Sequence, residues 1–205
     1  MNRKEHWENI YNTKQLNEVS WYQPTPQQSI NWIKKHFPNK DAAIIDIGGG
    51  DSFLPDHLID LGYSNITVLD ISEKAIKRAK ERLGDKATQV KWVISDIIHF
   101  TPLNQYDGWH DRAAFHFLRD PQDIQTYKRL MESSLRDGGK AMIGTFSKNG
   151  PLKCSGIQIQ QYSKEDFERI FSDDFELRDV QNIDHSTPFD TTQNFNFFQL
   201  KLRRD

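Results

Sequence analysis

An apolar run that ends in three glycines constrains the fold of this chain more than any other segment. Residues 42–50 read AAIIDIGGG, so a short hydrophobic stretch passes directly into a turn without Cβ atoms. A nearly continuous apolar run of this length is typical of a strand buried on both faces of a parallel sheet. The glycines let the backbone at the end of that strand approach a ligand closely. We therefore expect an α/β sheet with a ligand site at its strand ends.

Further strand signals alternate with helical ones along the chain. Helical spacing of Leu54, Leu58 and Leu61 predicts a helix after the glycine turn, with Ser52 as its cap. The remaining strands of this pattern are expected at residues 65–72, 90–96, 106–115 and 140–146, with helices at 72–84 and 121–135. Strands that alternate with helices indicate parallel strands joined by helical crossovers.

The last part of the chain departs from this alternation. Residues 163–171 predict a short helix in which Ser163 and Asp166 occupy capping-box positions. Two strand-like segments, 175–181 and 194–204, then follow each other without a helix, which predicts an antiparallel pair at the sheet edge. The expected fold is α/β: a Rossmann-like, doubly wound, seven-stranded sheet, mostly parallel with an antiparallel edge strand, and with helices on both faces.

Aspartates end three of the expected strands: Asp46, Asp70 and Asp96. Asp70 follows the glycine turn at the distance where a carboxylate accepts hydrogen bonds from ribose hydroxyls. The dinucleotide fingerprint requires a third glycine where this chain has Phe53, and Asp46 would repel a pyrophosphate. A carboxylate there suits the cationic amino group of a methionine-type ligand. Each aspartate has the alternative role of capping the following helix.

These segments resemble the class I S-adenosylmethionine-dependent methyltransferases. The resemblance covers residues 42–146 and rests on DIGGGDS at 46–52, LDIS at 69–72 and SDI at 95–97, although Ser52 replaces a glycine common in the family. The segments SWYQ at 20–23 and WHDRAAFHF at 109–117 are similar to a bacterial branch of that family. The resemblance implies S-adenosylmethionine (SAM) as cofactor. The residues expected to bind it are Trp21, Tyr22, Asp46, Gly48, Gly49, Gly50, Ser52, Asp70, Ile71, Ser95, Asp96, Ile97 and His110.

A length of 205 residues without a linker-like segment indicates one domain, which we expect to be a single class I methyltransferase domain over residues 1–205. We expect an N-terminal helical cap at 1–40, a cofactor-binding core at 41–146, and an acceptor-side loop, helix and last two strands at 147–205.

Four side chains compete for a catalytic role: His110, Asp111, His116 and His185. His116 lies in an aromatic run that favours a hydrogen-bonded core histidine, which leaves His110, Asp111 and His185 as the residues expected to be catalytic. A histidine is the first candidate when an acceptor must lose a proton near neutral pH. His110 and Asp111 end the strand beside the expected methyl group, and Asp184 is placed to orient His185. The alternatives are that Asp111 only fixes the turn with Arg112, that His185 belongs to a hairpin loop, and that no base is needed.

Composition limits the classes of partner. A formal net charge of -2 gives no general attraction for nucleic acid, and one cysteine, Cys154, gives neither an internal disulfide nor a metal site. No apolar stretch reaches the length of a membrane span or a secretory signal, so a cytoplasmic monomer or homodimer is expected. We expect a small-molecule methyl acceptor, with a protein side chain such as lysine as the alternative. Two other classes stay open: an NAD(P)-dependent oxidoreductase and a non-catalytic cofactor-binding domain.

Overall fold

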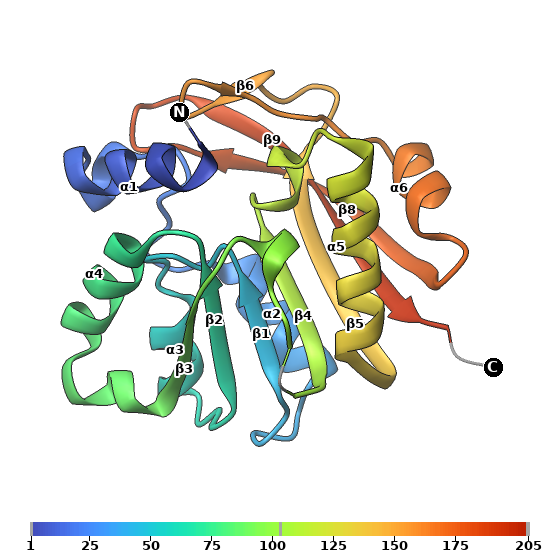
Figure 1. Ribbon diagram of the computed structural model, residues 1–205, viewed down its shortest axis with the longest axis horizontal. Helices are drawn as coiled ribbons and strands as arrows, with labels where there is room; N and C mark the ends of the chain where they lie inside the picture. The colour runs from blue at the N-terminus through green and yellow to red at the C-terminus, as the bar shows by residue number, and fades with distance from the viewer. Residues whose placement is uncertain (1, 103, 204–205) are drawn as a thin grey trace.

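A seven-stranded sheet runs through the centre of the protein in the order β3-β2-β1-β4-β5-β9-β8 (Figure 1). The computed structural model describes residues 2–102 and 104–203. Its strands are β1 (Ile44–Ile47), β2 (Ile66–Asp70), β3 (Val90–Ile94), β4 (Tyr106–Arg112), β5 (Leu135–Phe146), β8 (Phe175–Ser186) and β9 (Thr192–Leu202). The neighbouring strands β3, β2, β1, β4 and β5 are parallel to one another. Strand β9 runs antiparallel to both β5 and β8. The expected seven-stranded α/β fold is confirmed, with the antiparallel strand inserted next to β5 and with β8 outermost.

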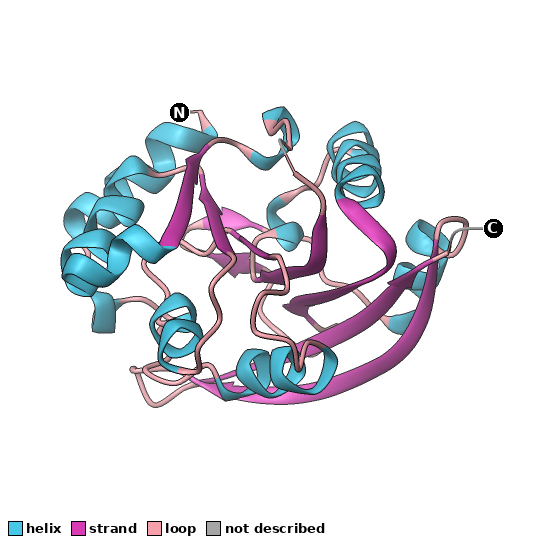
Figure 2. Ribbon diagram, turned by 90° about the horizontal axis from the view of Figure 1, so that it is seen from below, coloured by secondary structure: helices cyan, strands magenta, loops and turns pink. Residues whose placement is uncertain are grey.

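Helices cover both faces of the sheet (Figure 2). The α-helices are α1 (Arg3–Thr13), α2 (Gln27–His36), α3 (Leu54–Asp60), α4 (Glu73–Leu83), α5 (Pro121–Ser134) and α6 (Lys164–Phe171). Short 3-10 helices are η1 (Leu16–Glu18), η2 (Gly84–Gln89), η3 (Ile97–His99) and η4 (Phe115–Phe117). In the described part of the chain, no helix is long and apolar enough to cross a membrane.

Two hydrophobic layers fix these helices to the sheet. Helices α2, α3 and α4 bury Ile33, Leu58 and Ile76 against one face. On the other face, α5 and α6 bury side chains such as Tyr127 and Phe167. Because both faces are covered, the central strands carry apolar side chains on each side, as the run at 42–47 predicts.

Three local features differ from the expectation. Helix α3 has Phe53 at its N-cap, and Ser52 lies one residue earlier, where its hydroxyl accepts a hydrogen bond from Leu54 N–H at 3.1 Å. Asp184 and His185 pair with β9 inside β8, so they do not form a hairpin loop. A small antiparallel pair, β6 (Lys153–Cys154) and β7 (Ile157–Gln158), follows β5.

Helix α1 lies above the sheet at the end where the parallel strands finish, beside α4 (Figure 1). The Glu8 carboxylate accepts hydrogen bonds from the first backbone amides of α4, at 2.7 Å from Glu73 N and 3.3 Å from Lys74 N. Arg78 of α4 donates to the carbonyls of Tyr11 and Lys14 at 3.1 and 2.9 Å. These bonds hold the helix over the strand ends, where the ligand site is expected.

Candidate functional site

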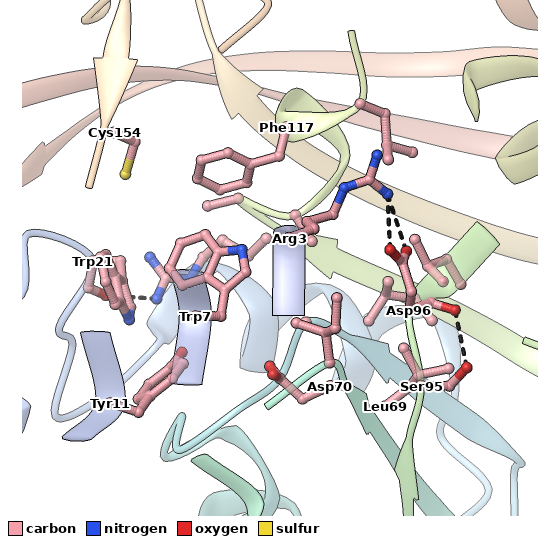
Figure 3. Close-up of a pocket in the computed structure, with 18 residues that line it drawn as sticks. Arg3, Trp7, Tyr11, Trp21, Leu69, Asp70, Ser95, Asp96, Phe117 and Cys154 are labelled. Carbon is pink, nitrogen blue, oxygen red and sulfur yellow. Dashed lines mark hydrogen bonds and ion pairs between the residues drawn. The ribbon is translucent and has the colours of Figure 1, made fainter. Parts of the chain in front are cut away.

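A cleft lies between α1 and the carboxyl ends of the parallel strands, and the empty space at it, open solvent included, is about 740 Å³ (Figure 3). We call it the main cleft; among the predicted residues that line it are Trp21, Gly48, Asp70, Ile71, Ser95, Asp96 and Ile97. A smaller, more polar side cavity adjoins it and is lined by Trp21, Asp46, Gly48, Gly49, Ser52 and His110, among others. Because Trp21 and Gly48 line both, the two spaces are neighbours. Their position outside the strand ends suits a small-molecule ligand.

The glycine turn is shaped by close packing as well as by access to the cleft. Gly48 has φ +64°, and a Cβ there would lie 2.6 Å from the Cβ of Ala114. At Gly49 a Cβ would lie 2.6 Å from Asp46 Oδ2, and at Gly50 (φ +47°) it would lie 2.8 Å from the Tyr11 hydroxyl. Gly50 lines neither space. The turn therefore requires glycine for the protein's own packing, and Gly48 and Gly49 also leave room for a ligand.

Asp46 presents one carboxylate oxygen without a partner. Its Oδ1 lies 2.6 Å from His110 Nδ1, whereas the buried Oδ2 has no hydrogen-bond partner among the described residues. The side chain is buried, with the residue 3% exposed, and it lines the side cavity. An unsatisfied buried carboxylate oxygen is costly, so a cationic or N–H-bearing ligand group that reaches the Asp46 carboxylate from the side cavity would stabilise it.

Asp70 ends β2 with a carboxylate directed into the main cleft (Figure 3). Its Oδ1 accepts a hydrogen bond from Ser72 N–H at 2.8 Å. Burial, together with the nearby carboxylates of Asp51 and Asp46, raises the pKa of Asp70 to about 7. A ligand that donates hydrogen bonds to this carboxylate would stabilise its ionised form.

Asp96 is already engaged by a residue from the other end of the sequence. Arg3 Nη1 lies 3.1 and 3.0 Å from the two carboxylate oxygens of Asp96 (Figure 3). Arg3 Nη2 lies 2.5 Å from an oxygen of Asp123. Asp96 Oδ1 also accepts from Ile98 N–H at 3.3 Å and so caps η3. A carboxylate has about four lone-pair sites, so Asp96 retains the capacity to accept from a ligand. Arg3 thereby closes one end of the main cleft.

The two adjacent candidates on β4 face opposite sides of the sheet. His110 points toward Asp46 and α2, where its Nε2 lies 2.8 Å from the Ser29 hydroxyl. Asp111 is fully buried on the α5 side, where it accepts hydrogen bonds from Ala114 N–H, Phe115 N–H and the Tyr127 hydroxyl. Asp111 lines neither the main cleft nor the side cavity. The geometry therefore does not support Asp111 as a catalytic residue; its carboxylate holds the turn after β4.

His185 and Tyr22 also lie outside both spaces. His185 Nε2 lies 2.7 Å from the Ser20 carbonyl, and its Nδ1 lies 3.0 Å from the Gln23 amide nitrogen. Both ring nitrogens are thus used to anchor segment 20–23, and Asp184 does not orient this ring, because it accepts from Asn194 instead. Tyr22 packs edge-on against Phe53 at 6.1 Å between ring centroids.

Several residues that line the main cleft were not predicted as site residues: Arg3, Trp7, Tyr11, Arg112, Phe117 and Cys154. A signal for the first three exists in the sequence, since positions 3, 7 and 11 share one face of a helix. The aromatic rings of Trp7, Trp21 and Phe117 meet edge to face, with centroids 5.8 Å apart for Trp7–Trp21 and 5.0 Å for Trp7–Phe117. Within residues 2–102 and 104–203, no cluster of three His, Cys, Asp or Glu side chains could hold a metal ion.

The known proteins that this chain resembles are methyltransferases. Residues 44–139 match the family model described as "Methyltransferase domain". The chain is 25% identical over 189 residues to EEF1A lysine methyltransferase 2 of Homo sapiens, which covers 85% of this chain and 74% of the human protein. It is 28% identical over 107 residues to malonyl-(acyl-carrier protein) O-methyltransferase 2 of Ilyobacter polytropus, covering 52% of this chain and 40% of that protein.

Solved structures have the same fold. A SAM-dependent methyltransferase from Anabaena variabilis superposes with a TM-score of 0.75 at 16% identity, covering 99% of this chain and 96% of that one. The N-methyltransferase NodS from Bradyrhizobium japonicum, in complex with S-adenosylhomocysteine (SAH), gives a TM-score of 0.72 at 14% identity, covering 99% and 100%.

Proposed function

Because the chain carries a class I SAM-dependent methyltransferase domain, we propose that it transfers the methyl group of SAM to a small molecule bound in the main cleft. SAM supplies a sulfonium-activated methyl carbon, so the protein's part is to align the nucleophile with that carbon and to exclude water. The observation that carries the proposal is the buried carboxylate of Asp46, which lines the side cavity beside the glycine turn and has one oxygen without a hydrogen-bond partner among the described residues.

The main cleft and the side cavity divide the cofactor between them in this proposal. Asp70 would accept hydrogen bonds from the ribose, Ile71 and Ile97 would contact the adenine, and Ser95 and Asp96 would lie at its amino edge. In the side cavity, Asp46 would bind the methionine amino group. Gly48 lines both spaces, whereas Gly49 and Ser52 line the side cavity alone. Trp21 lines both spaces and would cover the cofactor where the main cleft meets the side cavity.

We propose that His110 acts as a positioning residue rather than as the base. Its two ring nitrogens lie within hydrogen-bond distance of Asp46 and Ser29, so the ring fixes the orientation of the Asp46 carboxylate at the side cavity. His185 and Asp111 act on the structure around the cleft, the first through segment 20–23 and the second through the turn after β4.

A small molecule is favoured as acceptor because α1 and its Arg3–Asp96 contact cover the main cleft. The relatives are divided: one is named a lysine methyltransferase and another an O-methyltransferase of a malonyl group on a carrier protein. A protein lysine remains the second candidate because the lysine methyltransferase matches 85% of the chain. A cytoplasmic location, a monomeric or homodimeric state and the division at residues 40 and 146 stay predictions.

Calorimetric titration with SAM, SAH, NAD and NADP tests the proposal. Micromolar binding of SAM and SAH alone is expected, and Asp46→Asn should weaken it by removing the charge that faces the amino group. Binding of a dinucleotide alone would overturn the proposal in favour of an oxidoreductase. Binding of SAM without turnover of any acceptor would favour a non-catalytic domain.

A further inference from the structure

Arg112 is a cation of the cleft without an ion-pair partner. Its Nη2 donates to the Trp21 carbonyl at 2.7 Å, and among the described residues no carboxylate oxygen lies within 4.0 Å of its guanidinium nitrogens. The other partly buried arginines near the cleft, Arg3, Arg78 and Arg82, each form an ion pair with an aspartate. Arg112 lines both the main cleft and the side cavity, so its free N–H groups face ligand space.

Burial disfavours the charged form of the Arg112 guanidinium. Loss of water around the guanidinium lowers the pKa of Arg112 to about 10, although the field of the nearby Asp46 carboxylate acts in the opposite direction. Guanidinium groups bind carboxylates and other anions through paired N–H donors. The position of an unpaired arginine at the junction of the two spaces therefore indicates an anionic ligand group.

The acceptor end of the main cleft offers an apolar wall beside this cation. Figure 3 shows Trp21, Trp7, Phe117 and Cys154 on the side of the cleft away from Asp70, Ser95 and Asp96. Aromatic side chains in this arrangement bury a flat or apolar body.

No side chain at this end is suited to remove a proton from an acceptor. The described residues that line the main cleft include no histidine, glutamate or lysine, and its two carboxylates, Asp70 and Asp96, lie at the opposite end (Figure 3). Burial raises the pKa of the Tyr11 hydroxyl, which also lines the cleft, so it is not a base near neutral pH. His116 is buried near the cleft, but burial lowers its pKa to about 3, and burial raises the pKa of the Cys154 thiol. A neutral amine would also become a cation next to Arg112 when it is methylated, which the charge of Arg112 opposes. An acceptor that is already anionic avoids both problems.

We propose that Arg112 and the aromatic wall of Trp7, Trp21 and Phe117 select a small anionic acceptor, a thiolate or carboxylate carried on an apolar or aromatic body. In the transfer, the anion's lone pair forms the new bond to the methyl carbon while the sulfonium–carbon bond breaks. The electron pair of that bond stays on sulfur, and no proton has to be removed. The inference rests on the proposed function, since it assigns the acceptor of that same site.

Calorimetric titration of the SAH-loaded protein with benzoate, thiophenol at pH 8 and benzylamine tests the proposal. These probes share an aromatic body and differ in charge. We expect the two anions to bind at least tenfold more tightly than benzylamine, and Arg112→Gln to weaken their binding about 10- to 100-fold with little effect on SAH. Arg119→Gln is the matched control, because Arg119 is exposed on the loop before α5. Methylation of the anions by SAM should follow the same order.

Each contrary result has a distinct meaning. Equal or tighter binding of benzylamine, or anion binding that Arg112→Gln leaves unchanged, would overturn the anionic acceptor. If SAH affinity falls as much as anion affinity, Arg112 serves the methionine carboxylate of the cofactor and the inference is wrong. Failure of the wild-type protein to bind SAM or SAH would refute the proposed function instead. Arg112→Lys, which keeps the charge but not the paired donors, separates loss of folding from loss of the site by retaining part of the anion affinity.

Discussion

Replacing Asp70 with asparagine should make the ligand-free protein more stable and the cofactor site weaker. Burial raises the pKa of Asp70 from its ordinary value of 3.8 to about 7, so the folded protein holds this proton more tightly than the unfolded chain does. The contribution of this tighter proton binding to the free energy of unfolding is therefore fully present below about pH 4, and it is lost as pH rises through 7. A rise of that size in pKa lowers the free energy of unfolding of the ligand-free wild type at pH 8 by at most about 4 kcal/mol, relative to its value below pH 4.

The asparagine side chain would remove the charge and keep an oxygen for Ser72 N–H, which donates to Asp70 Oδ1 at 2.8 Å. The ligand-free Asp70→Asn protein should melt several degrees above the wild type at pH 8, since each kcal/mol moves the Tm of a chain of this size by about 2–4 °C. At pH 5 the difference should shrink. SAM affinity should fall by about 1.5–3 kcal/mol, because two ribose hydroxyls lose a charged acceptor.

Thermal melts at pH 5 and pH 8 and calorimetry with SAM at pH 8 measure both effects. Asp85→Asn is the matched control, because Asp85 is exposed and its carboxylate faces solvent. A variant that melts below the wild type at both pH values would show that Asp70 is not a buried charge held at a cost. Unchanged SAM affinity would refute the ribose assignment.

Three further substitutions test the surroundings of the cleft. Gly48→Ala should destabilise the protein by about 2–4 kcal/mol in denaturant titrations, because a Cβ would lie 2.6 Å from that of Ala114 at a φ of +64°. A change below about 1 kcal/mol would mean that the turn relaxes easily. Asp111→Ala should lower the free energy of unfolding by about 3 kcal/mol or more, since three donors lose their acceptor. The SAM affinity of the folded variant should stay nearly unchanged. A selective loss of turnover in a stable variant would support a catalytic role for Asp111. Arg3→Met should speed SAH release in stopped-flow measurements by about tenfold, because it removes the contacts to Asp96 and Asp123; an unchanged rate would show that α1 does not limit release.

Local signals account for the parts of the fold and site that the sequence predicts well. Buried parallel strands are recognisable as apolar runs, and their carboxyl ends meet at one edge of the sheet, so Asp46, Asp70 and Asp96 could be placed together without coordinates. The capping box at Ser163 and Asp166 is likewise a local pattern, and it is present at the start of α6.

A local rule already separates the two candidates on β4, and the catalytic role of Asp111 stays a prediction. Successive side chains of a strand point to opposite faces, so His110 and Asp111 could not both face the same cavity. The structure assigns His110 to the Asp46 side and Asp111 to the Tyr127 side.

Long-range pairing explains what the sequence could not provide. Arg3 meets Asp96 and Asp123 across 93 and 120 residues, and no periodicity connects such positions. The same holds for Ser20 and His185, which are 165 residues apart. The unpaired state of Arg112 is also invisible in the sequence, because the adjacent Asp111 suggests an ion pair that the strand geometry does not allow.

The contacts of α1 have a consequence for the order of events during synthesis. This helix leaves the ribosome before the residues that hold it, on α4, at Asp96 and at Asp123, which follow 65 to 120 residues later. An 11-residue helix with a weakly apolar face is marginal on its own in water. A segment that is made early is therefore among the last to reach its final place, after the sheet has formed from β1 to β4.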